Sequence, residues 1–443
     1  MKNLKKIISV TAAAAMVMST VAPVSVFADD ATFKIGGIGP VTGAAAIYGQ
    51  AVKNATELAI NEVNEDGGIN GYQVEFKFED DENDAEKTLN AYNALKDWGM
   101  NVLVGTVTST PCVAVANETA ADNMFQLTPS GSATECVANP NVFRVCFSDP
   151  NQGTAAAQYI GEHKLATKVA IIYDSSDVYS SGITQNFTAE AANQGIEIVS
   201  SEAFTADNNK DFSVQLQKAK DGGAELVFLP IYYTEASLIL AQADSMGFET
   251  KFFGCDGMDG ILGVENFDTS LAEGVMLLTP FSATSEDEKS QAFVKAYEDA
   301  NKDEVPNQFA ADAYDAVYAV KLALEKAGVN DASMSASDIC DKVKVAMTEI
   351  TLDGVTGSTT WTADGEPTKI DFSKHFVVAK VLPVTNHLTN ILLRRIKHSG
   401  DKCLILVWHI AVNDTSLAYS MQPMKLVILD KKYERYQLLE KVE

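Results

Sequence analysis

The chain has 443 residues, of which 46% are hydrophobic, and its formal net charge at pH 7 is −26. This length accommodates two ordinary domains, each with a hydrophobic core of its own. The acidic balance argues against nucleic acid and against anionic membrane surfaces as partners. We therefore expect a globular protein of more than one domain.

The first residues predict a secretory signal peptide at 1–28. A basic head at 2–6 precedes an apolar run at 7–21 that is too short for a comfortable membrane span. The small residues Val26 and Ala28 then stand three and one positions before a cleavage site. No cysteine lies in this segment, so we expect export to the periplasm or the cell exterior, associated with the cell envelope, without lipidation at the cleavage site.

Strands and helices alternate regularly through the first part of the chain. Apolar periodicity predicts strands at 33–38, 74–78, 102–104 and 124–128, and helices at 52–63, 85–98 and 111–122. This alternation is typical of βαβ units, which form a mostly parallel sheet with helices on both faces.

The same pattern then restarts. We expect strands at 142–146, 169–173, 196–199, 226–229 and 252–254, and helices at 149–163, 187–191, 212–219 and 235–246. Three further helices are expected at 287–301, 307–326 and 335–348. The sequence thus predicts an α/β protein with two similar, doubly wound, Rossmann-like domains.

The chain is expected to cross between these domains three times, near Ser148, near Thr279 and near 356–358, and the crossings would act as a hinge. The predicted first lobe comprises 31–148 and 279–357, and the predicted second lobe comprises 149–278 and 358–381. Open α/β sheets bind ligands at the carboxyl ends of their strands, so we expect the site in the cleft between the two lobes.

The stretch 102–111 reads as a buried strand, a glycine turn and the first turn of a helix. Ser109 precedes Pro111 by two residues, a pattern typical of a helix start. Such a helix end presents unpaired amides and a positive dipole end, which suits a ligand carboxylate. The alternative is that Ser109 only caps its own helix.

Motifs of common enzymes are missing from the sequence. The glycines at 36–39 lack the dinucleotide-binding spacing, and neither a Walker loop nor a Gly-x-Ser-x-Gly elbow occurs. The six cysteines form no Cys-x-x-Cys or Cys-x-x-His pattern, so we expect no metal site. We predict a binding protein without a cofactor, and not an enzyme.

At this point several segments, in order, resemble the leucine/isoleucine/valine-binding protein family, the type I periplasmic binding proteins that deliver solutes to ABC transporters. The resemblance covers 33–381. It rests on Ile38-Gly39-Pro40-Val41-Thr42-Gly43, Asn64-Glu65-Asp66-Gly67-Gly68, Val104-Gly105 with Ser109, Thr128-Pro129-Ser130, Arg144, Asp149-Pro150-Asn151-Gln152-Gly153, Tyr179-Ser180-Ser181-Gly182 and Gly254-Cys255-Asp256-Gly257.

The resemblance implies that Ser109, Ser130 and Ser132 hold the α-carboxylate of an amino acid. Serine hydroxyls and helix-terminal amides can make charge-assisted hydrogen bonds to a carboxylate without a countercharge. Ser130 stands where family members often have alanine, which adds a hydroxyl. The alignment around Ser132 allows several choices.

The resemblance assigns the α-ammonium to Asp256, where the best-known members carry glutamate; the alternative is a simple turn after a strand. Tyr179 and Tyr232 match tyrosines that close over the ligand backbone. Tyr179 could instead be loop packing, and a shift of one residue would exchange Tyr232 with Tyr233. Tyr48 matches an aromatic residue that lines the side-chain pocket.

The family implies an extracytoplasmic, monomeric solute-binding protein of an ABC importer. It would bind a small amino acid, branched-chain or related, as a zwitterion, close by hinge motion and deliver it to a membrane permease. The alternative is a receptor-type binding protein that senses amino acids or amides. Because the resemblance places the loops before Cys112 and Cys136 side by side, a disulfide between them is one hypothesis, and free buried thiols are the other.

The last 62 residues, 382–443, differ from the rest. They contain 9 Lys/Arg and 6 Asp/Glu, a net charge of +3, against 25 and 54, a net charge of −29, in the residues before them. We interpret this basic tail as an appended module, a partner-docking segment or translation past a frameshift, and favour the last.

Overall fold

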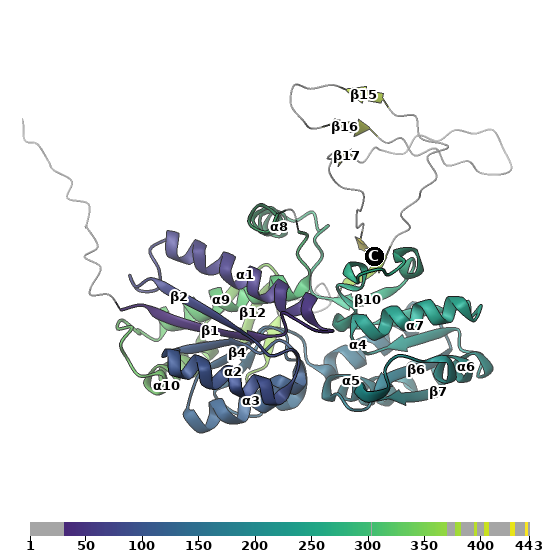
Figure 1. The fold of residues 1–443 in the computed structure, drawn as a ribbon, viewed down its shortest axis with the longest axis horizontal. Helices are drawn as coiled ribbons and strands as arrows, with labels where there is room; N and C mark the ends of the chain where they lie inside the picture. The colour runs from purple at the N-terminus through teal and green to yellow at the C-terminus, as the bar shows by residue number, and fades with distance from the viewer. Residues whose placement is uncertain are drawn as a thin grey trace, which may run out of the picture.

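The computed structural model describes residues 31–302 and 304–369 with their side chains, and beyond them the backbone of five short strands. Figure 1 shows two lobes side by side, the first containing α1, α2 and α3 and the second containing α4 to α7. The predicted signal peptide at 1–28 lies outside the described residues. Among the described residues, no helix combines the length and the apolar character that a membrane crossing needs.

The first lobe is built on a parallel five-stranded sheet in the order β2-β1-β3-β4-β5. Its strands are β1 Phe33–Gly39, β2 Val74–Asp80, β3 Val102–Gly105, β4 Gln126–Thr128 and β5 Val142–Arg144. Its crossover helices are α1 Ala46–Glu65, α2 Ala85–Trp98 and α3 Ser109–Asp122, with η1 Thr134–Val137 after β4. Every residue of β3 is buried, as expected for a strand covered on both faces.

The second lobe repeats this plan. Its seven-stranded sheet has the order β18-β14-β10-β9-β8-β6-β7. Strands β6 to β10 are parallel to one another, β14 is antiparallel to β10, and β18 is antiparallel to β14. The parallel strands are β6 Lys168–Asp174, β7 Glu197–Phe204, β8 Leu226–Leu229, β9 Lys251–Gly254 and β10 Met276–Thr279. The helices are α4 Asp149–Glu162, α5 Val178–Ala191, α6 Ser213–Asp221 and α7 Tyr233–Ser245, with the short turns η2 Ala206–Asn208, η3 Asp256–Met258, η4 Ile261–Gly263 and η5 Thr269–Ala272.

The chain then returns to the first lobe. Helices α8 Glu288–Ala300 and α9 Gln308–Lys326 contact α1, and α10 Ala336–Ala346 with η6 Met347–Glu349 follows. A small antiparallel sheet comprises β11 Thr351–Gly354, β12 Gly357–Trp361 and β13 Pro367–Lys369. Trp361 is buried in the same core as Phe33 of β1, so this sheet packs on the first lobe. The lobe boundaries given above remain predictions.

The prediction of two doubly wound α/β domains is confirmed. In the first lobe, the core contains residues of α1 and α9 on one side of the sheet and of α2 and α3 on the other. The largest difference in a predicted strand is at β7, which runs to Phe204 and not to 199. It is the edge strand, and its partly exposed polar residues gave no apolar pattern to detect.

Of the tail at 382–443, the structure describes only backbone strands. They are β15 Arg394–Ile396, β16 Cys403–Leu406 and β17 Leu426–Leu429, which form a separate small sheet, and β18 Leu439–Lys441. β18 pairs with β14 Val377–Val381, so a segment of the tail joins the sheet of the second lobe.

Candidate functional site

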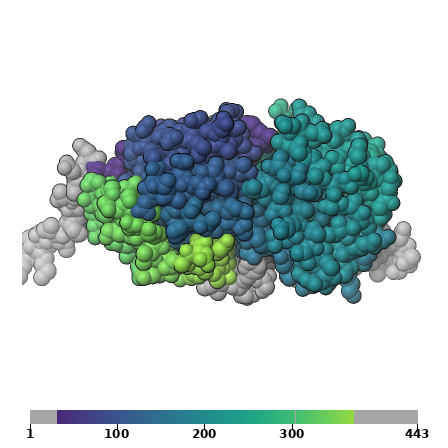
Figure 2. All heavy atoms as spheres, turned by 90° about the horizontal axis from the view of Figure 1, so that it is seen from below, coloured from purple at the N-terminus to yellow at the C-terminus, as the bar shows by residue number. Residues whose placement is uncertain are grey.

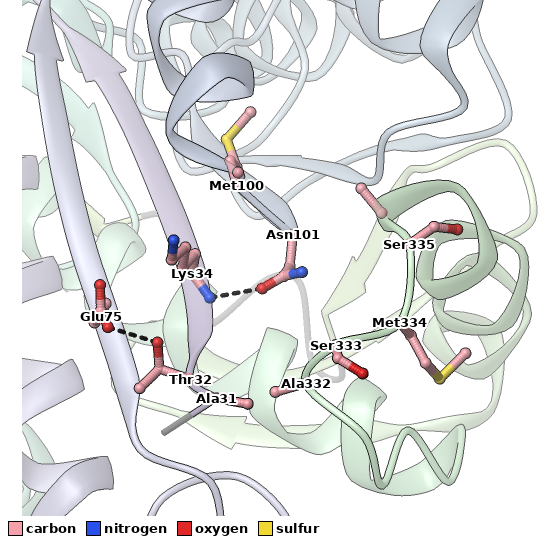
Figure 3. Close-up of a pocket in the computed structure, with 12 residues that line it drawn as sticks. Ala31, Thr32, Lys34, Glu75, Met100, Asn101, Ala332, Ser333, Met334 and Ser335 are labelled. Carbon is pink, nitrogen blue, oxygen red and sulfur yellow. Dashed lines mark hydrogen bonds between the residues drawn. The ribbon is translucent and has the colours of Figure 1, made fainter. Parts of the chain in front are cut away.

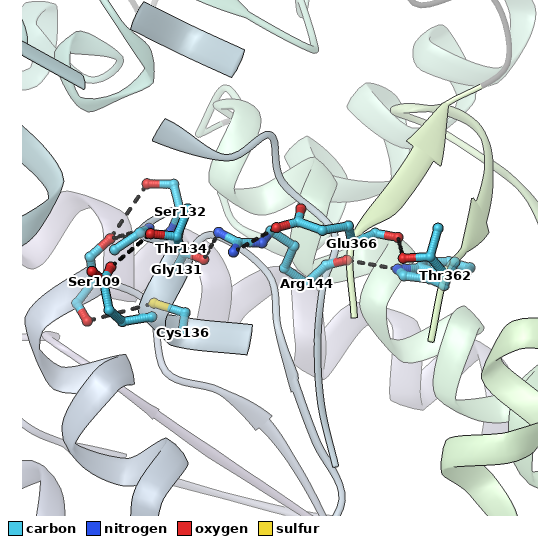
Figure 4. A network of polar contacts seen from close by, with 11 residues as sticks. Ser109, Gly131, Ser132, Thr134, Cys136, Arg144, Thr362 and Glu366 are labelled. Carbon is cyan, nitrogen blue, oxygen red and sulfur yellow. Dashed lines mark hydrogen bonds and ion pairs between the residues drawn. The ribbon is translucent and has the colours of Figure 1, made fainter. Parts of the chain in front are cut away.

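The first pole of the site lies where β3 ends and α3 begins. Ser109 is buried there, and its Oγ accepts hydrogen bonds of 3.2 Å from the backbone amides of Ser132 and Ala133 (Figure 4). The cap position of α3 is Thr108, and no side chain caps the helix. The interpretation of Ser109 as the cap of its own helix is therefore wrong.

The loop after β4 brings two further predicted serines to Ser109. The Ser132 Oγ lies 3.4 Å from the Ser109 Oγ, and both side chains are buried. Ser130 is also buried, but its hydroxyl donates a 2.6 Å hydrogen bond to the carbonyl of Val107. The extra hydroxyl at position 130 therefore fixes the loop against the strand end, and Ser109 and Ser132 form the polar pair.

The second pole is the carboxylate of Asp256, in η3 directly after β9. Tyr179 Oη donates a hydrogen bond of 2.7 Å to its Oδ1, and Gln152 Nε2 donates one of 2.9 Å to its Oδ2. Asp256 is 8% exposed, and burial raises the pKa of its carboxyl to about 6. These side-chain partners are neutral, so the negative charge has hydrogen bonds without an ion pair.

Three predicted tyrosines gather beside Asp256. Tyr179 and Tyr232 are stacked with ring centroids 5.0 Å apart, and Tyr48 meets Tyr232 edge-on at 5.6 Å. Tyr233 Oη instead accepts a hydrogen bond from the amide of Ile47, away from the stack. Of the neighbours at 232 and 233, Tyr232 is thus the one that lies against Tyr179.

Tyr48 belongs to α1 of the first lobe but bonds to the second. Its hydroxyl donates to the carbonyl of Gly257 and accepts from the amide of Tyr233. Its ring also packs against Phe309 at a centroid distance of 4.2 Å. Burial raises the pKa of Tyr48 well above its usual value, so the hydroxyl keeps its proton. Tyr48 therefore joins the lobes.

The structure adds two residues to which the sequence analysis gave no role. Asp149 is 1% exposed, its backbone amide donates a 2.9 Å hydrogen bond to the carbonyl of Ser132, and its Oδ1 has no partner among the described residues. Burial raises the pKa of the Asp149 carboxyl well above its usual range. Gln152, three residues later, contacts Asp256. Both lie in the Asp149-Pro150-Asn151-Gln152-Gly153 segment, which carried the resemblance but offered no chemistry of its own.

Two cavities help to delimit the site. One of about 550 Å³ lies at the amino end of β1, between Lys34, Asn101 and Ser333, and contains none of the predicted site residues (Figure 3). A much smaller one lies against Asp256, lined also by Gln152, Gln308 and Asp312. The chemistry gathers around the smaller cavity, at the carboxyl ends of the strands.

Cys112 and Cys136 lie beside this site. Both are fully buried and free, and the Cys136 thiol donates a hydrogen bond of 3.7 Å to the carbonyl of Ser109. The two cysteines therefore form no disulfide in the structure, and they agree with the alternative hypothesis of free buried thiols. Within the part of the chain that the structure describes, no group of three or more His, Cys, Asp or Glu side chains is arranged to hold a metal ion.

Several hydrogen bonds cross between the lobes. Thr110 Oγ1 of α3 donates to Asp177 Oδ1 at 3.0 Å, and Thr234 Oγ1 of α7 donates to the carbonyl of Ala44 at 2.7 Å. Figure 2 shows the two lobes meeting along a seam on the face in view. A buried polar site between two doubly wound lobes defines the class of two-lobed α/β binding proteins.

Comparison with known proteins narrows this class. The family profile described as periplasmic binding protein matches residues 32–370. Leu/Ile/Val-binding protein homolog 3 of Brucella melitensis is 31% identical over 338 residues, which cover 75% of this chain and 87% of the relative. The leucine-, isoleucine-, valine-, threonine-, and alanine-binding protein of Pseudomonas aeruginosa is 29% identical over 81% of this chain and 93% of its own.

The fold agrees with these relatives. The branched-chain amino acid transporter substrate binding protein LivJ from Streptococcus pneumoniae, in complex with isoleucine, superposes with a TM-score of 0.69 and 25% identity, covering 90% of this chain and 100% of its own. The chain therefore belongs to the periplasmic binding protein family, with the type I architecture of the Leu/Ile/Val-binding proteins. These relatives are named as binding proteins, which is consistent with a non-enzyme.

Proposed function

We propose that this protein is the extracytoplasmic solute-binding protein of an ABC importer and binds a small amino acid as a zwitterion between its lobes. One observation carries the proposal: the first turn of α4 contacts both poles of the site. The backbone amide of Asp149 donates a 2.9 Å hydrogen bond to the carbonyl of Ser132 in the first pole, and the side chain of Gln152 donates one of 2.9 Å to Asp256 in the second. Residues three apart on a helix are neighbours, with about 5–6 Å between their Cβ atoms, so the two poles lie near each other, as the adjacent charged groups of an α-amino acid require.

In this proposal the ligand carboxylate takes hydrogen bonds from Ser109, Ser132 and the nearby amides, and the ammonium pairs with Asp256. A carboxylate that is 8% exposed and lacks a cationic partner is costly to bury, and an arriving ammonium removes that cost. Ser130 supports the loop, while Tyr179 and Tyr232 cover the ligand backbone. Tyr48 and Phe309 offer the aromatic surface for an apolar side chain.

Closure follows from the same geometry. The ligand binds to the first lobe through Ser109, and the second lobe brings Asp256 and Tyr179 over it. Both charges of a zwitterion must then find partners at once, which couples ligand fit to the closed arrangement. The branched-chain and small amino acids in the names of the relatives supply the candidate ligands. The closed form is what a membrane permease would recognise.

A thermal-shift screen of the purified protein against the free amino acids and their carboxamides tests the proposal. A ligand that binds only the folded state stabilises it by RT ln(1 + [L]/Kd), about 2.7 kcal/mol at a hundredfold excess over Kd. We expect branched-chain or small amino acids to raise the melting temperature, and calorimetry to give one site per chain. A screen in which no amino acid shifts the melting temperature would contradict the proposal.

A further inference from the structure

A buried arginine lies behind the first pole. Arg144, at the end of β5, is 0% exposed, and its side chain runs from the loop at 130–133 to the turn between β12 and β13 (Figure 4). Burying a guanidinium is costly unless its donors and its charge are both satisfied. The surroundings of Arg144 must therefore compensate for the cost of its burial.

The guanidinium makes polar contacts through two of its nitrogens, and the third nitrogen has none among the described residues. Its NH1 group donates to the carbonyl of Gly131 at 3.0 Å, and its NH2 group contacts Glu366 Oε1 at 3.1 Å. Its Nε is buried and has no partner among the described residues. Glu366 is partly exposed, with 34% of its side chain accessible, so solvent weakens this ion pair. Part of the positive charge thus remains available to the interior.

The carbonyl that Arg144 contacts belongs to the peptide group that serves the first pole. The carbonyl of Gly131 and the amide of Ser132 are the two ends of one peptide unit, and that amide donates to Ser109 Oγ at 3.2 Å. A charged donor on the oxygen of a peptide group polarises it and strengthens its N–H as a donor. The guanidinium is therefore connected to the pole by a single peptide plane.

The backbone of Arg144 is fixed independently of its side chain. Its amide donates to the carbonyl of Gly365 at 3.0 Å, and its carbonyl accepts a 2.7 Å hydrogen bond from Trp361 Nε1. The small sheet of residues 351–369 thus holds β5 in place. Arginine suits the position because its planar fork can donate to Gly131 and Glu366 at once, which a lysine ammonium cannot do with the same geometry.

We propose that Arg144 is a positioning residue that makes the site selective for a carboxylate. Its guanidinium orients and polarises the Gly131–Ser132 peptide and supplies positive charge behind donors that are themselves neutral. This inference rests on the proposed function, since it assigns the first pole to a ligand carboxylate. It predicts that Arg144 contributes more to the binding of an amino acid than to the binding of the corresponding amide.

The test compares L-leucine with L-leucinamide, in which the group that would face this pole is a neutral amide in place of a carboxylate. Calorimetry gives both affinities for the wild-type protein and for Arg144→Met, which keeps an apolar stem and removes the charge. We expect the ratio of leucine to leucinamide affinity to fall by about tenfold in the variant, because charged hydrogen bonds contribute more than neutral ones. A change that only loosens the fold would weaken both ligands alike.

Two further variants keep the test decisive. Glu366→Gln removes the carboxylate that competes with the ligand for the charge of Arg144 and leaves Arg144 in place. The ratio of leucine to leucinamide affinity should therefore stay the same or rise. If Arg144→Met does not fold, Arg144→Lys retains a charge without the fork, and we expect an intermediate ratio. An unchanged ratio in a folded Arg144 variant would overturn the role of Arg144 alone. If the wild-type protein binds neither ligand, the amino acid that stabilises it most in the thermal-shift screen and the carboxamide of that amino acid replace them. A protein that binds no amino acid would overturn the proposed function and this role with it.

Discussion

Asp256 is a buried carboxylate that accepts hydrogen bonds from a phenol, Tyr179, and from an amide side chain, Gln152. Its identity as an acid after a strand is visible in the sequence, but its surroundings are not. Tyr179 and Gln152 come from helices 77 and 104 residues away along the chain. No local pattern could place them around Asp256, and the family resemblance supplied the role of Tyr179 but gave none to Gln152.

Replacement of Asp256 tests the ammonium pole. Asp256→Asn keeps the side-chain shape and removes the charge, so we expect amino-acid affinity to fall by about a hundredfold or more, as when one partner of a buried ion pair is removed. Isothermal titration calorimetry measures the loss. Asp81→Asn is the matched control, since Asp81 is also buried, burial likewise raises its pKa to about 6, and its carboxylate bonds Asn83 and Thr88 and neither pole. Similar losses in the two variants would contradict the assignment of the ammonium to Asp256.

The pKa of Asp256 also predicts a pH dependence of binding. As the pH falls below about 6, the carboxyl of the ligand-free protein takes up a proton that must leave when an ammonium binds. Amino-acid affinity should therefore fall by up to about tenfold per pH unit in this range. Calorimetry across this range measures the effect, and a wild-type affinity that stays constant below pH 6 would contradict it.

Ligand-free stability should change in the opposite direction. The folded pKa, about 6, lies above the ordinary value of 3.8, so the folded state binds more protons between these values. The free energy of unfolding should thus rise as the pH falls through this window. In the Asp256→Asn variant, the rise in the free energy of unfolding should be smaller. The part that remains should come from groups such as Asp259, because burial also raises the pKa of the Asp259 carboxyl to about 6. Urea unfolding at several pH values compares the two proteins.

At the scale of elements, the alternation of apolar runs was sufficient to predict most strands and helices of both lobes in their order, but it missed β10 and the small sheet of β11 to β13. It could not show how the loops at their ends meet. The start of α3 is the clearest case: the local pattern suggested that Ser109 caps its helix, whereas its hydroxyl accepts from two amides of the loop after β4. Such a contact between loops depends on strand order, which a single sequence does not reveal.

Ser109→Ala should remove the acceptor for those two amides. We expect a loss of about 1–3 kcal/mol in the free energy of unfolding, because buried donors would be left unsatisfied. Amino-acid affinity should fall as well, since the same hydroxyl belongs to the carboxylate pole. Chemical unfolding and calorimetry measure the two effects. Ser290→Ala, at a buried serine of α8, controls for loss of a buried hydroxyl elsewhere, and an equal affinity loss there would refute the role of Ser109.

At the scale of the whole molecule, two lobes joined by crossings are held together by a small number of polar contacts. The hydroxyl of Tyr48 contributes two of them, to Gly257 and Tyr233. The resemblance predicted an aromatic residue of the side-chain pocket at this position. The structure adds that the same residue bonds across the lobes, which the sequence could not show because its partners lie 185 and 209 residues away.

Tyr48→Phe should keep the ring contacts and remove these hydrogen bonds. We expect the arrangement of the lobes to shift toward a more open form, with amino-acid affinity reduced about five- to tenfold. Small-angle scattering of the ligand-free protein should then give a larger radius of gyration than for the wild type. Tyr318→Phe, whose hydroxyl bonds Glu62 within the first lobe, is the control. Identical scattering and affinity for Tyr48→Phe and the wild type would count against a closing role.

The first turn of α4 has a consequence for the length of the ligand. The backbone amide of Asp149 contacts the first pole and the side chain of Gln152 contacts the second, and both residues belong to one rigid helical turn, so backbone geometry fixes how far apart these contacts lie. A β- or γ-amino acid places one or two more methylenes between its charged ends and would reach both poles only by bending. Under the proposed function, we therefore expect the helix to favour α-amino acids over their longer homologues by chain length, independently of the side chain.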